Sequence, residues 1–223
     1  MIKIALDGPS GAGKSTVAKA LAKELGVVYV DTGALYRTVG YFVRMNDADP
    51  KDPEAVGALL DKIHIEIKYV DGAQHVYLNG EDLGDKIRTP EMSMYASAVS
   101  AIPAVRSFLL DTQRDIARKN SVVMDGRDIG TVILPDAEVK VFMVASAEAR
   151  AKRRYKELIA KGENAQYETV LAEMIERDHN DKNRDIAPAV PADDAVIMDN
   201  SDMSIEDNVR AVIDLINERG LKI

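Results

Sequence analysis

The segment at residues 8–15 reads Gly-Pro-Ser-Gly-Ala-Gly-Lys-Ser, and its G-x-x-x-x-G-K-S pattern restricts the folds open to this chain. A loop of this kind requires a buried strand before it and a helix after it. Residues 2–6 form a short apolar run typical of a buried strand, and the apolar spacing over residues 18–25 is helical, with Gly26 as a stop. Strand, glycine loop and helix together predict the first unit of a parallel α/β sheet.

The chemistry of the same loop indicates a polyphosphate site. Its glycines let the backbone turn several N–H groups toward one point, and the positive end of the following helix favours negative charge there. Lys14 can reach the outer phosphates and is expected to face solvent without them, and the Ser15 hydroxyl can ligate Mg²⁺. A chance match in a flexible loop is the alternative, but it does not explain the flanking strand and helix. We therefore expect a nucleoside triphosphate to bind at Gly8, Pro9, Ser10, Gly11, Ala12, Gly13, Lys14, Ser15 and Thr16.

Further apolar runs alternate with helical patterns along the chain, which predicts a doubly wound, five-stranded parallel sheet. The strands are expected at residues 2–6, 27–30, 122–125, 139–144 and 195–199. The later helices are expected at residues 104–119, 146–162, 168–183 and 204–220, with Ser146 and Ser204 as N-caps.

One region has a different pattern and indicates an insertion. Residues 64–70 alternate polar and apolar side chains, Asp71-Gly72 follows, and residues 75–80 resume the alternation, as in a half-exposed antiparallel hairpin. The polar segment 46–53, which carries two prolines, is expected to be a loop. We predict a core at residues 1–60 and 104–223, a helical lid at about 146–188, and a small antiparallel insertion at 61–103.

Composition restricts the partners. The 37 acidic residues outnumber the 29 basic ones, giving a net charge of −8, which disfavours broad nucleic-acid binding. The chain has no cysteine, so disulfides and cysteine-ligated metals are excluded. No apolar run approaches the ~18 residues of a membrane span, and no leader precedes the first strand. We expect a cytoplasmic monomer that binds neither nucleic acid nor membrane.

Arginines recur at strand and helix ends, as phosphoryl transfer between nucleotides would require. Arg150, Arg153 and Arg154 share one helix face, and Arg177 and Arg184 share a face of the next helix. Two such helices could close over the phosphates and exclude water. A solvated basic face, or an Arg177–Asp181 network within one helix, is the alternative.

Four segments together resemble the bacterial cytidylate kinase family: Gly-Pro-Ser-Gly-Ala-Gly-Lys-Ser-Thr at 8–16, Asp-Thr-Gly-Ala-Leu-Tyr-Arg at 31–37, Asp-Gly-Arg-Asp-Ile-Gly-Thr at 125–131, and Arg-Asp-His-Asn-Asp-Lys-Asn-Arg at 177–184. The resemblance covers essentially the whole chain. It implies the P-loop fold of nucleoside monophosphate kinases and transfer of the γ-phosphoryl of ATP to CMP or dCMP, with Mg²⁺, as a step of pyrimidine nucleotide metabolism.

The resemblance also implies roles for particular residues. Thr32, Tyr36 and Arg37 would border the monophosphate, Arg127 and Arg184 would bind its phosphate, Asp181 and Arg177 would contact the sugar, and Ser97, Arg106 and Asp128 would face the base. A carboxylate and an arginine do complement the amino donor and the ring acceptors of cytosine. We expect Lys14, Arg127, Arg150, Arg154 and Arg184 to be catalytic, and Ser15, with Asp125, to hold Mg²⁺.

Two other functions remain open from the residues alone. A guanine-reading Asn-Lys-x-Asp segment is absent, which argues against a GTPase. A P-loop kinase of another monophosphate or small substrate is the first alternative, and a substrate panel separates it from a CMP kinase. A nucleotide-binding module without transfer activity is the second, and a single-turnover assay for CDP excludes or supports it.

Overall fold

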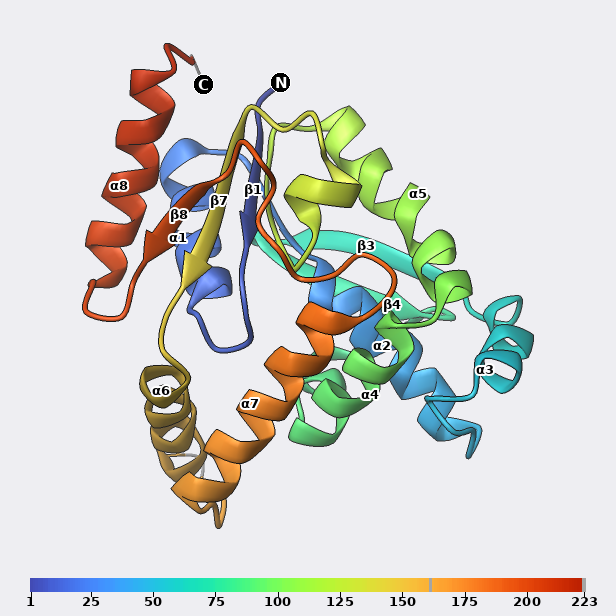
Figure 1. The fold of residues 1–223 in the computed structure, drawn as a ribbon. Helices are drawn as coiled ribbons and strands as arrows, with labels where there is room; N and C mark the ends of the chain where they lie inside the picture. The colour runs from blue at the N-terminus through green and yellow to red at the C-terminus, as the bar shows by residue number, and fades with distance from the viewer. Residues whose placement is uncertain (161, 222–223) are drawn as a thin grey trace. The chain divides into compact units, whose positions relative to one another are not determined.

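The computed structural model describes residues 1–160 and 162–221, and the chain forms two compact units (Figure 1). Unit 1 comprises Met1–Val27 and Ser121–Ile223, and unit 2 comprises Val28–Asn120. The insertion predicted at residues 61–103 lies inside unit 2. That these residues form a separate domain stays a prediction.

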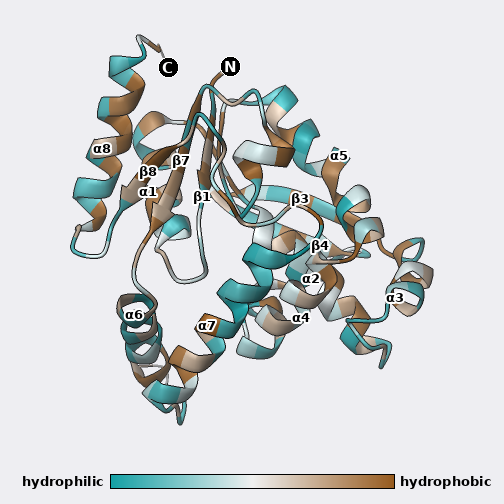
Figure 2. Cartoon of the chain, in the orientation of Figure 1, coloured by the Kyte–Doolittle hydropathy of each residue, from teal (hydrophilic) through white to brown (hydrophobic). Residues whose placement is uncertain are grey.

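The main sheet has the five strands that the sequence predicted, and the structure places them in the order β2-β6-β1-β7-β8. β1 pairs in parallel with β6 and with β7, in registers that place Leu6 opposite Asp125 and Asp7 opposite Phe142. β1, β6 and β7 are apolar because they are covered on both faces, and β1 and β7 are accordingly hydrophobic in Figure 2. The strands are β1 (Lys3–Asp7), β2 (Val28–Asp31), β6 (Val122–Asp125), β7 (Val139–Val144) and β8 (Val196–Asp199).

Helices α1 (Lys14–Leu25) and α8 (Ile205–Glu218) pack against each other and against strands of unit 1. α1 ends at Gly26, whose φ of 66° is the left-handed conformation that glycine adopts readily. The Ser204 side chain caps α8 by accepting a hydrogen bond from the backbone N–H of Asp207. Both helix ends confirm predictions from local residue type.

Helices α6 (Ala147–Ala160) and α7 (Tyr167–Asn183) lie side by side and share a small apolar cluster (Figure 1). Ser146 Oγ accepts a hydrogen bond from the backbone N–H of Ala149, as an N-cap does. The N-terminal half of α7 supplies Val170 and Met174 to the cluster, while its C-terminal half is hydrophilic (Figure 2). A π-helical turn, η2 (Ile129–Ile133), follows β6 and was not predicted.

Unit 2 confirms the predicted hairpin and the helix predicted at residues 104–119, and it adds elements that were not predicted, among them α3, α4 and β5. β3 pairs antiparallel with β4, and β4 pairs with a short third strand, β5. Helices α2, α3, α4 and α5 surround its apolar core together with β4. The elements are α2 (Thr32–Met45), α3 (Pro53–Leu60), β3 (Ile65–Val70), β4 (Ala73–Leu78), β5 (Glu81–Asp82), η1 (Gly84–Ile87), α4 (Pro90–Ser100) and α5 (Pro103–Lys119).

Among the described residues, no single helix is long and apolar enough to cross a membrane. Pro90–Ser100 and Pro103–Lys119 pass that test only when taken together, and they are bent by 101° at the break between them.

Candidate active site

The phosphate loop connects β1 to α1 and is held against the sheet. Gly8, Gly11 and Gly13 all have positive φ, which permits the tight path of the loop. A Cβ atom at Gly8 would lie 2.1 Å from the carbonyl oxygen of Met143 on β7, so only glycine lets the backbone approach this strand. The sequence of the loop thus fixes its shape.

Lys14 is buried, with 5% of its surface exposed, and its Nζ donates a hydrogen bond to the carbonyl oxygen of Pro9 at 2.7 Å. The prediction that this lysine faces solvent is therefore wrong. Burial, reinforced by the positive charge of Arg127, holds the pKa of Lys14 well below its usual value. The ammonium group lies over the loop, where a phosphate oxygen could replace the carbonyl of Pro9 as its partner.

Ser15 and Asp125 form the pair from which a magnesium site can be built. Ser15 Oγ donates a hydrogen bond to Asp125 Oδ2 at 2.7 Å, and the Asp125 carboxylate is buried at the carboxyl end of β6. Mg²⁺ is usually bound by one or two such oxygens together with substrate phosphates and water. The donor set therefore fits Mg²⁺, although no cluster of three or more His, Cys, Asp or Glu ligands occurs within residues 1–160 and 162–221.

Asp7, which sequence reasoning did not single out, connects β1 to the segment after Asp128. Its two carboxylate oxygens accept hydrogen bonds from the backbone N–H groups of Ile129, at 2.8 Å, and Gly130, at 2.7 Å. Burial raises the pKa of Asp7 to about 7, although both backbone donors and Lys14 favour the charged form. No local pattern could have identified this residue, because its partners lie more than a hundred positions away.

Unit 1 brings together the five residues predicted there for the monophosphate. Arg127 Nε donates to Asp181 Oδ2 at 3.1 Å, and Arg177 Nε lies 3.9 Å from the same oxygen. Arg184 Nη2 lies 3.6 Å from Asp128 Oδ1. Burial would raise the pKa of Asp181, but the nearby guanidinium groups outweigh it and hold this pKa below its usual value.

The arginines of α6 have different surroundings. Arg150 is buried, donates to the carbonyl oxygen of Ser10 in the phosphate loop at 2.8 Å, and pairs with Asp178 of α7. Arg153 Nη2 donates to the carbonyl oxygens of Asn200 and Ser201. Arg154 lies 3.3 Å from Glu157 and keeps 31% of its side chain exposed. Arg150 thus joins α6 and α7 to the phosphate loop. Met174 of α7 also lies close to the loop, since a Cβ atom at Gly11 would come within 3.2 Å of it.

Unit 2 holds the other five predicted residues. Thr32, Tyr36 and Arg37 lie in the first two turns of α2, and Thr32 and Tyr36 are buried. Arg106 of α5 lies over the Tyr36 ring, 5.6 Å from its centroid, and donates to the carbonyl oxygen of Ser100. Ser97 lies on α4, one turn before Ser100.

Arg37 belongs to an ion-pair cluster whose other members the sequence did not indicate. Asp31 caps α2 by accepting from the backbone N–H of Ala34 at 2.9 Å through Oδ1. Its Oδ2 accepts from Arg37 Nη2 at 2.9 Å and from Arg88 Nη1 at 2.6 Å. Burial alone would raise the pKa of Asp31, but the two guanidinium groups hold it below its usual value.

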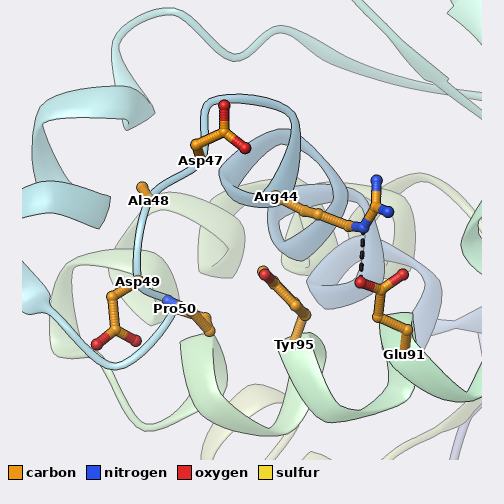
Figure 3. A pocket seen from close by; sticks show the side chains of 7 residues that line it. All are labelled: Arg44, Asp47, Ala48, Asp49, Pro50, Glu91 and Tyr95. Atoms are coloured by element: carbon orange, nitrogen blue, oxygen red, sulfur yellow. Dashed lines mark hydrogen bonds and ion pairs between the residues drawn. The ribbon is translucent and has the colours of Figure 1, made fainter.

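A pocket of about 500 Å³ on unit 2 has a polar lining and contains none of the predicted site residues (Figure 3). Arg44 and Glu91 pair at 2.7 Å on its wall, so the cation there is matched by an anion. The lining residues are Arg44, Asp47, Ala48, Asp49, Pro50, Glu91 and Tyr95.

Comparison with solved structures supports the fold. The chain superposes on shikimate kinase from Bacteroides thetaiotaomicron with a TM-score of 0.50 and 15% identity, over 97% of this chain and 98% of the other. An uncharacterized protein from Eubacterium ventriosum gives a TM-score of 0.53 and 15% identity, over 97% and 99%. At such low identity, these likenesses concern the fold alone.

Comparison of sequences identifies the family as well as the fold. The chain is 50% identical to a cytidylate kinase of Caldicellulosiruptor bescii over 96% of this chain and 95% of the relative. It is 49% identical to a cytidylate kinase of Fervidobacterium nodosum over 97% of both chains. A sequence model of the cytidylate kinase family matches residues 4–218. The chain belongs to the cytidylate kinase family.

Proposed function

We propose that this protein transfers the γ-phosphoryl group of ATP to CMP or dCMP, giving ADP and CDP or dCDP. Membership of the family, over nearly the full length of the chain, is the first support. The observation that carries the proposal is that the phosphate loop, the Ser15–Asp125 pair and the Arg127–Asp181 pair all lie in unit 1. The segment at residues 125–128, where β6 ends, supplies a carboxylate to the first pair and an arginine to the second.

The reaction needs no general base from the protein, because the attacking group is already a phosphate oxygen. Catalysis then depends on alignment and on stabilising negative charge as it spreads over the transferred group. Lys14 would contact the outer phosphates of ATP, and Arg127, Arg184, Arg150 and Arg154 would add positive charge. Mg²⁺, held through Ser15 and Asp125, would neutralise phosphate charge.

Arg150 and Arg154 differ in how readily they could take this role. Arg154 is partly exposed, and its exposed ion pair with Glu157 can be exchanged for a phosphate at little cost. Arg150 already contacts Ser10 and Asp178. It would therefore contribute positive charge through its contact with the phosphate loop, unless α6 and α7 rearrange. We also propose that residues 146–188 form a helical lid. Arg150 of α6 supports this, because it contacts both Ser10 of the phosphate loop and Asp178 of α7.

For the acceptor, we propose that CMP binds through the residues that the sequence predicts for it. Asp181 and Arg177 would bind the sugar, and Arg127 and Arg184 the phosphate. In unit 2, Thr32, Tyr36 and Arg37 would border the phosphate, and Ser97 and Arg106 would face the base. Asp128 would accept a hydrogen bond from the cytosine amino group. Charged groups held by ion pairs before substrate arrives are preorganised, which lowers the cost of binding.

A substrate panel tests the proposal. A coupled assay for ADP formation is run with CMP, dCMP, UMP, AMP, GMP and dTMP, and we expect CMP and dCMP to have the highest kcat/KM. A preference for UMP over CMP would indicate a kinase of a different monophosphate. If no CDP forms in a single turnover with ATP and CMP, the protein is a nucleotide-binding module without transfer activity.

A kinase that uses ATP and CMP works where these nucleotides are made and consumed, so a cytoplasmic location remains our proposal. The monomeric state and the lack of nucleic-acid or membrane partners also stay predictions.

A further inference from the structure

We propose that Asn200 is a positioning residue for the triphosphate of ATP, because its side chain sets the direction in which the phosphate loop presents the N–H group of Gly13. The inference rests on the proposed function, since it concerns how the ATP site is built. The residues that carry it all lie in unit 1. Asn200 follows β8 directly and is 188 positions from its partner Ala12, so no local pattern in the sequence indicates it.

Asn200 contacts the phosphate loop through one buried hydrogen bond. Its Nδ2 donates to the carbonyl oxygen of Ala12 at 2.6 Å, and Asn200 is 3% exposed. A carbonyl oxygen only accepts hydrogen bonds, so the side-chain atom that faces it is the amide nitrogen. The other end of the amide, Oδ1, is buried and has no hydrogen-bond partner within the described residues. The side-chain amide is thus committed to the Ala12 carbonyl.

The direction of the Ala12 carbonyl determines the direction of the next N–H group. The peptide unit between Ala12 and Gly13 is planar and trans, so its C=O and its N–H point to opposite sides. Holding the oxygen toward Asn200 therefore turns the Gly13 N–H to the other side of the loop. Gly13 has a φ of 83° and no Cβ, so it would tolerate a flipped peptide, and a fixed partner for the oxygen is needed to prevent this.

This orientation matters because an anion site must present donors rather than acceptors. A carbonyl oxygen aimed at a phosphate would repel it, whereas N–H groups that converge on one point attract it. Within residues 1–160 and 162–221, the Gly13 N–H donates to no backbone carbonyl, while the Gly13 carbonyl accepts from the N–H groups of Thr16 and Val17. The geometry thus keeps the Gly13 N–H for a ligand of the loop.

A second side chain acts on the loop in the same way. Arg150 Nη1 donates to the carbonyl oxygen of Ser10 at 2.8 Å, which turns the N–H of Gly11 to the opposite side of that peptide. Two peptides of the loop therefore have their carbonyl oxygens held by side chains from outside the loop. One of these side chains comes from α6, and the other, Asn200, comes from the segment after β8.

The backbone of Asn200 is itself held on both sides. Its N–H donates to the carbonyl oxygen of Val144 at 2.9 Å, which continues the parallel pairing of β7 with β8. Its carbonyl oxygen accepts from Arg153 Nη2 at 2.8 Å. A side chain on such a fixed backbone can hold the Ala12 peptide in one orientation before ATP binds, which lowers the cost of binding.

The test compares ligands that share adenosine but differ in their phosphates. Asn200→Leu replaces the amide by an apolar side chain of similar shape and adds no charge near the phosphates. Equilibrium dialysis with labelled ATP, without CMP, gives the dissociation constant of ATP, and unlabelled ADP and adenosine are measured as competitors. We expect the constants of ATP and ADP to rise about tenfold to a hundredfold, as for loss of a hydrogen bond to a charged group, and that of adenosine to stay within about twofold.

Asn208→Leu is the matched control. Asn208 is buried on α8 in the same unit, and its Nδ2 donates to the carbonyl oxygen of Ser204 at 2.7 Å. Its Oδ1 likewise has no hydrogen-bond partner in the described part of the chain. The change therefore removes the same kind of hydrogen bond from a carbonyl oxygen outside the phosphate loop, and all three dissociation constants should stay within about twofold of the wild-type values.

An unchanged affinity for ATP in Asn200→Leu would overturn the inference. Equal losses for ATP and adenosine would also overturn it, because they would indicate contact with the base or a general loss of structure. If Asn200→Leu fails to fold, Asn200→Ala, which removes the same donor without adding bulk, decides by the same comparison.

The dialysis measurement also separates this inference from the proposed function, because it does not require phosphoryl transfer. A wild-type protein that binds ATP but forms no CDP from CMP would contradict the proposed function. The dissociation constants of ATP and adenosine would still decide the role of Asn200.

Discussion

Asp7 Oδ2 accepts a hydrogen bond from the backbone N–H of Gly130 at 2.7 Å, which joins the strand before the phosphate loop to the segment after Asp128. Its other oxygen accepts from Ile129 at 2.8 Å. The carboxylate therefore fixes, relative to the loop, the backbone on which Arg127 and Asp128 are carried.

The raised pKa of Asp7 predicts a specific pH dependence of stability. Burial raises this pKa to about 7, whereas the unfolded chain has the ordinary value of 3.8. Between these values the folded protein holds a proton that the unfolded chain has lost, so the free energy of unfolding falls as pH rises, by up to about 1.4 kcal/mol per pH unit. Lys14 and Asp128 are the charged groups that act on Asp7 from nearby elements.

Asp7→Asn removes this titration and provides the comparison. Urea denaturation of both proteins at several values between pH 4.5 and 8 gives the difference in unfolding free energy, variant minus wild type. We expect this difference to increase with pH up to about 7 and then level off. A difference that is constant over the whole range would mean that Asp7 titrates normally.

Lys14→Ala should reduce phosphoryl transfer by orders of magnitude and leave the fold intact. The Lys14 ammonium group donates to the carbonyl oxygen of Pro9, and burial lowers its pKa, so removing this buried charge costs little stability. The measurement is kcat with saturating CMP, together with thermal unfolding. Lys23→Ala, at the exposed end of the same helix, is the control and should keep full activity. Unchanged kcat in Lys14→Ala would refute the assigned triphosphate site.

Asp125→Asn should raise the concentration of Mg²⁺ needed for half-maximal activity by about tenfold or more, because a charged ligand is replaced by a weaker neutral one. Ser15→Ala should act in the same direction, and the double variant should lose less than the two single losses combined, since the side chains are 2.7 Å apart. Asp136→Asn, an exposed carboxylate paired with Lys3, should not change the Mg²⁺ dependence. Simple additivity of the two losses would argue against a shared site.

Asp128→Ala should reduce kcat/KM for CMP far more than it affects KM for ATP. A charged hydrogen bond to the cytosine amino group is worth about 1.5–3 kcal/mol, or roughly tenfold to a hundredfold. UMP presents an acceptor at that position, so the carboxylate repels it, and the CMP-to-UMP ratio of kcat/KM should shrink in the variant. The rival role, in which Asp128 only holds Arg184 through their 3.6 Å pair, predicts an unchanged ratio.

Local sequence patterns determined much of this protein. The glycine loop, the parallel strands, the hairpin at β3 and β4, and the serine caps of α6 and α8 all follow from rules that act over a few residues, such as apolar periodicity and left-handed glycine. The same rules missed α3, because the two prolines in residues 46–53 are typical of a loop. Pro53 instead occupies the first turn of α3, with Asp52 as its cap, where a missing N–H costs nothing.

The site depended on tertiary structure wherever its contacts join distant parts of the chain. Asp7 is 122 positions from Ile129, and Arg88 is 57 positions from Asp31, so no periodicity or spacing could pair them. The burial of Lys14 likewise depends on the packed fold rather than on the loop motif. Hydrogen bonds and desolvation act through space, and these forces assign a buried charged side chain its partner and its pKa only once the strands have packed.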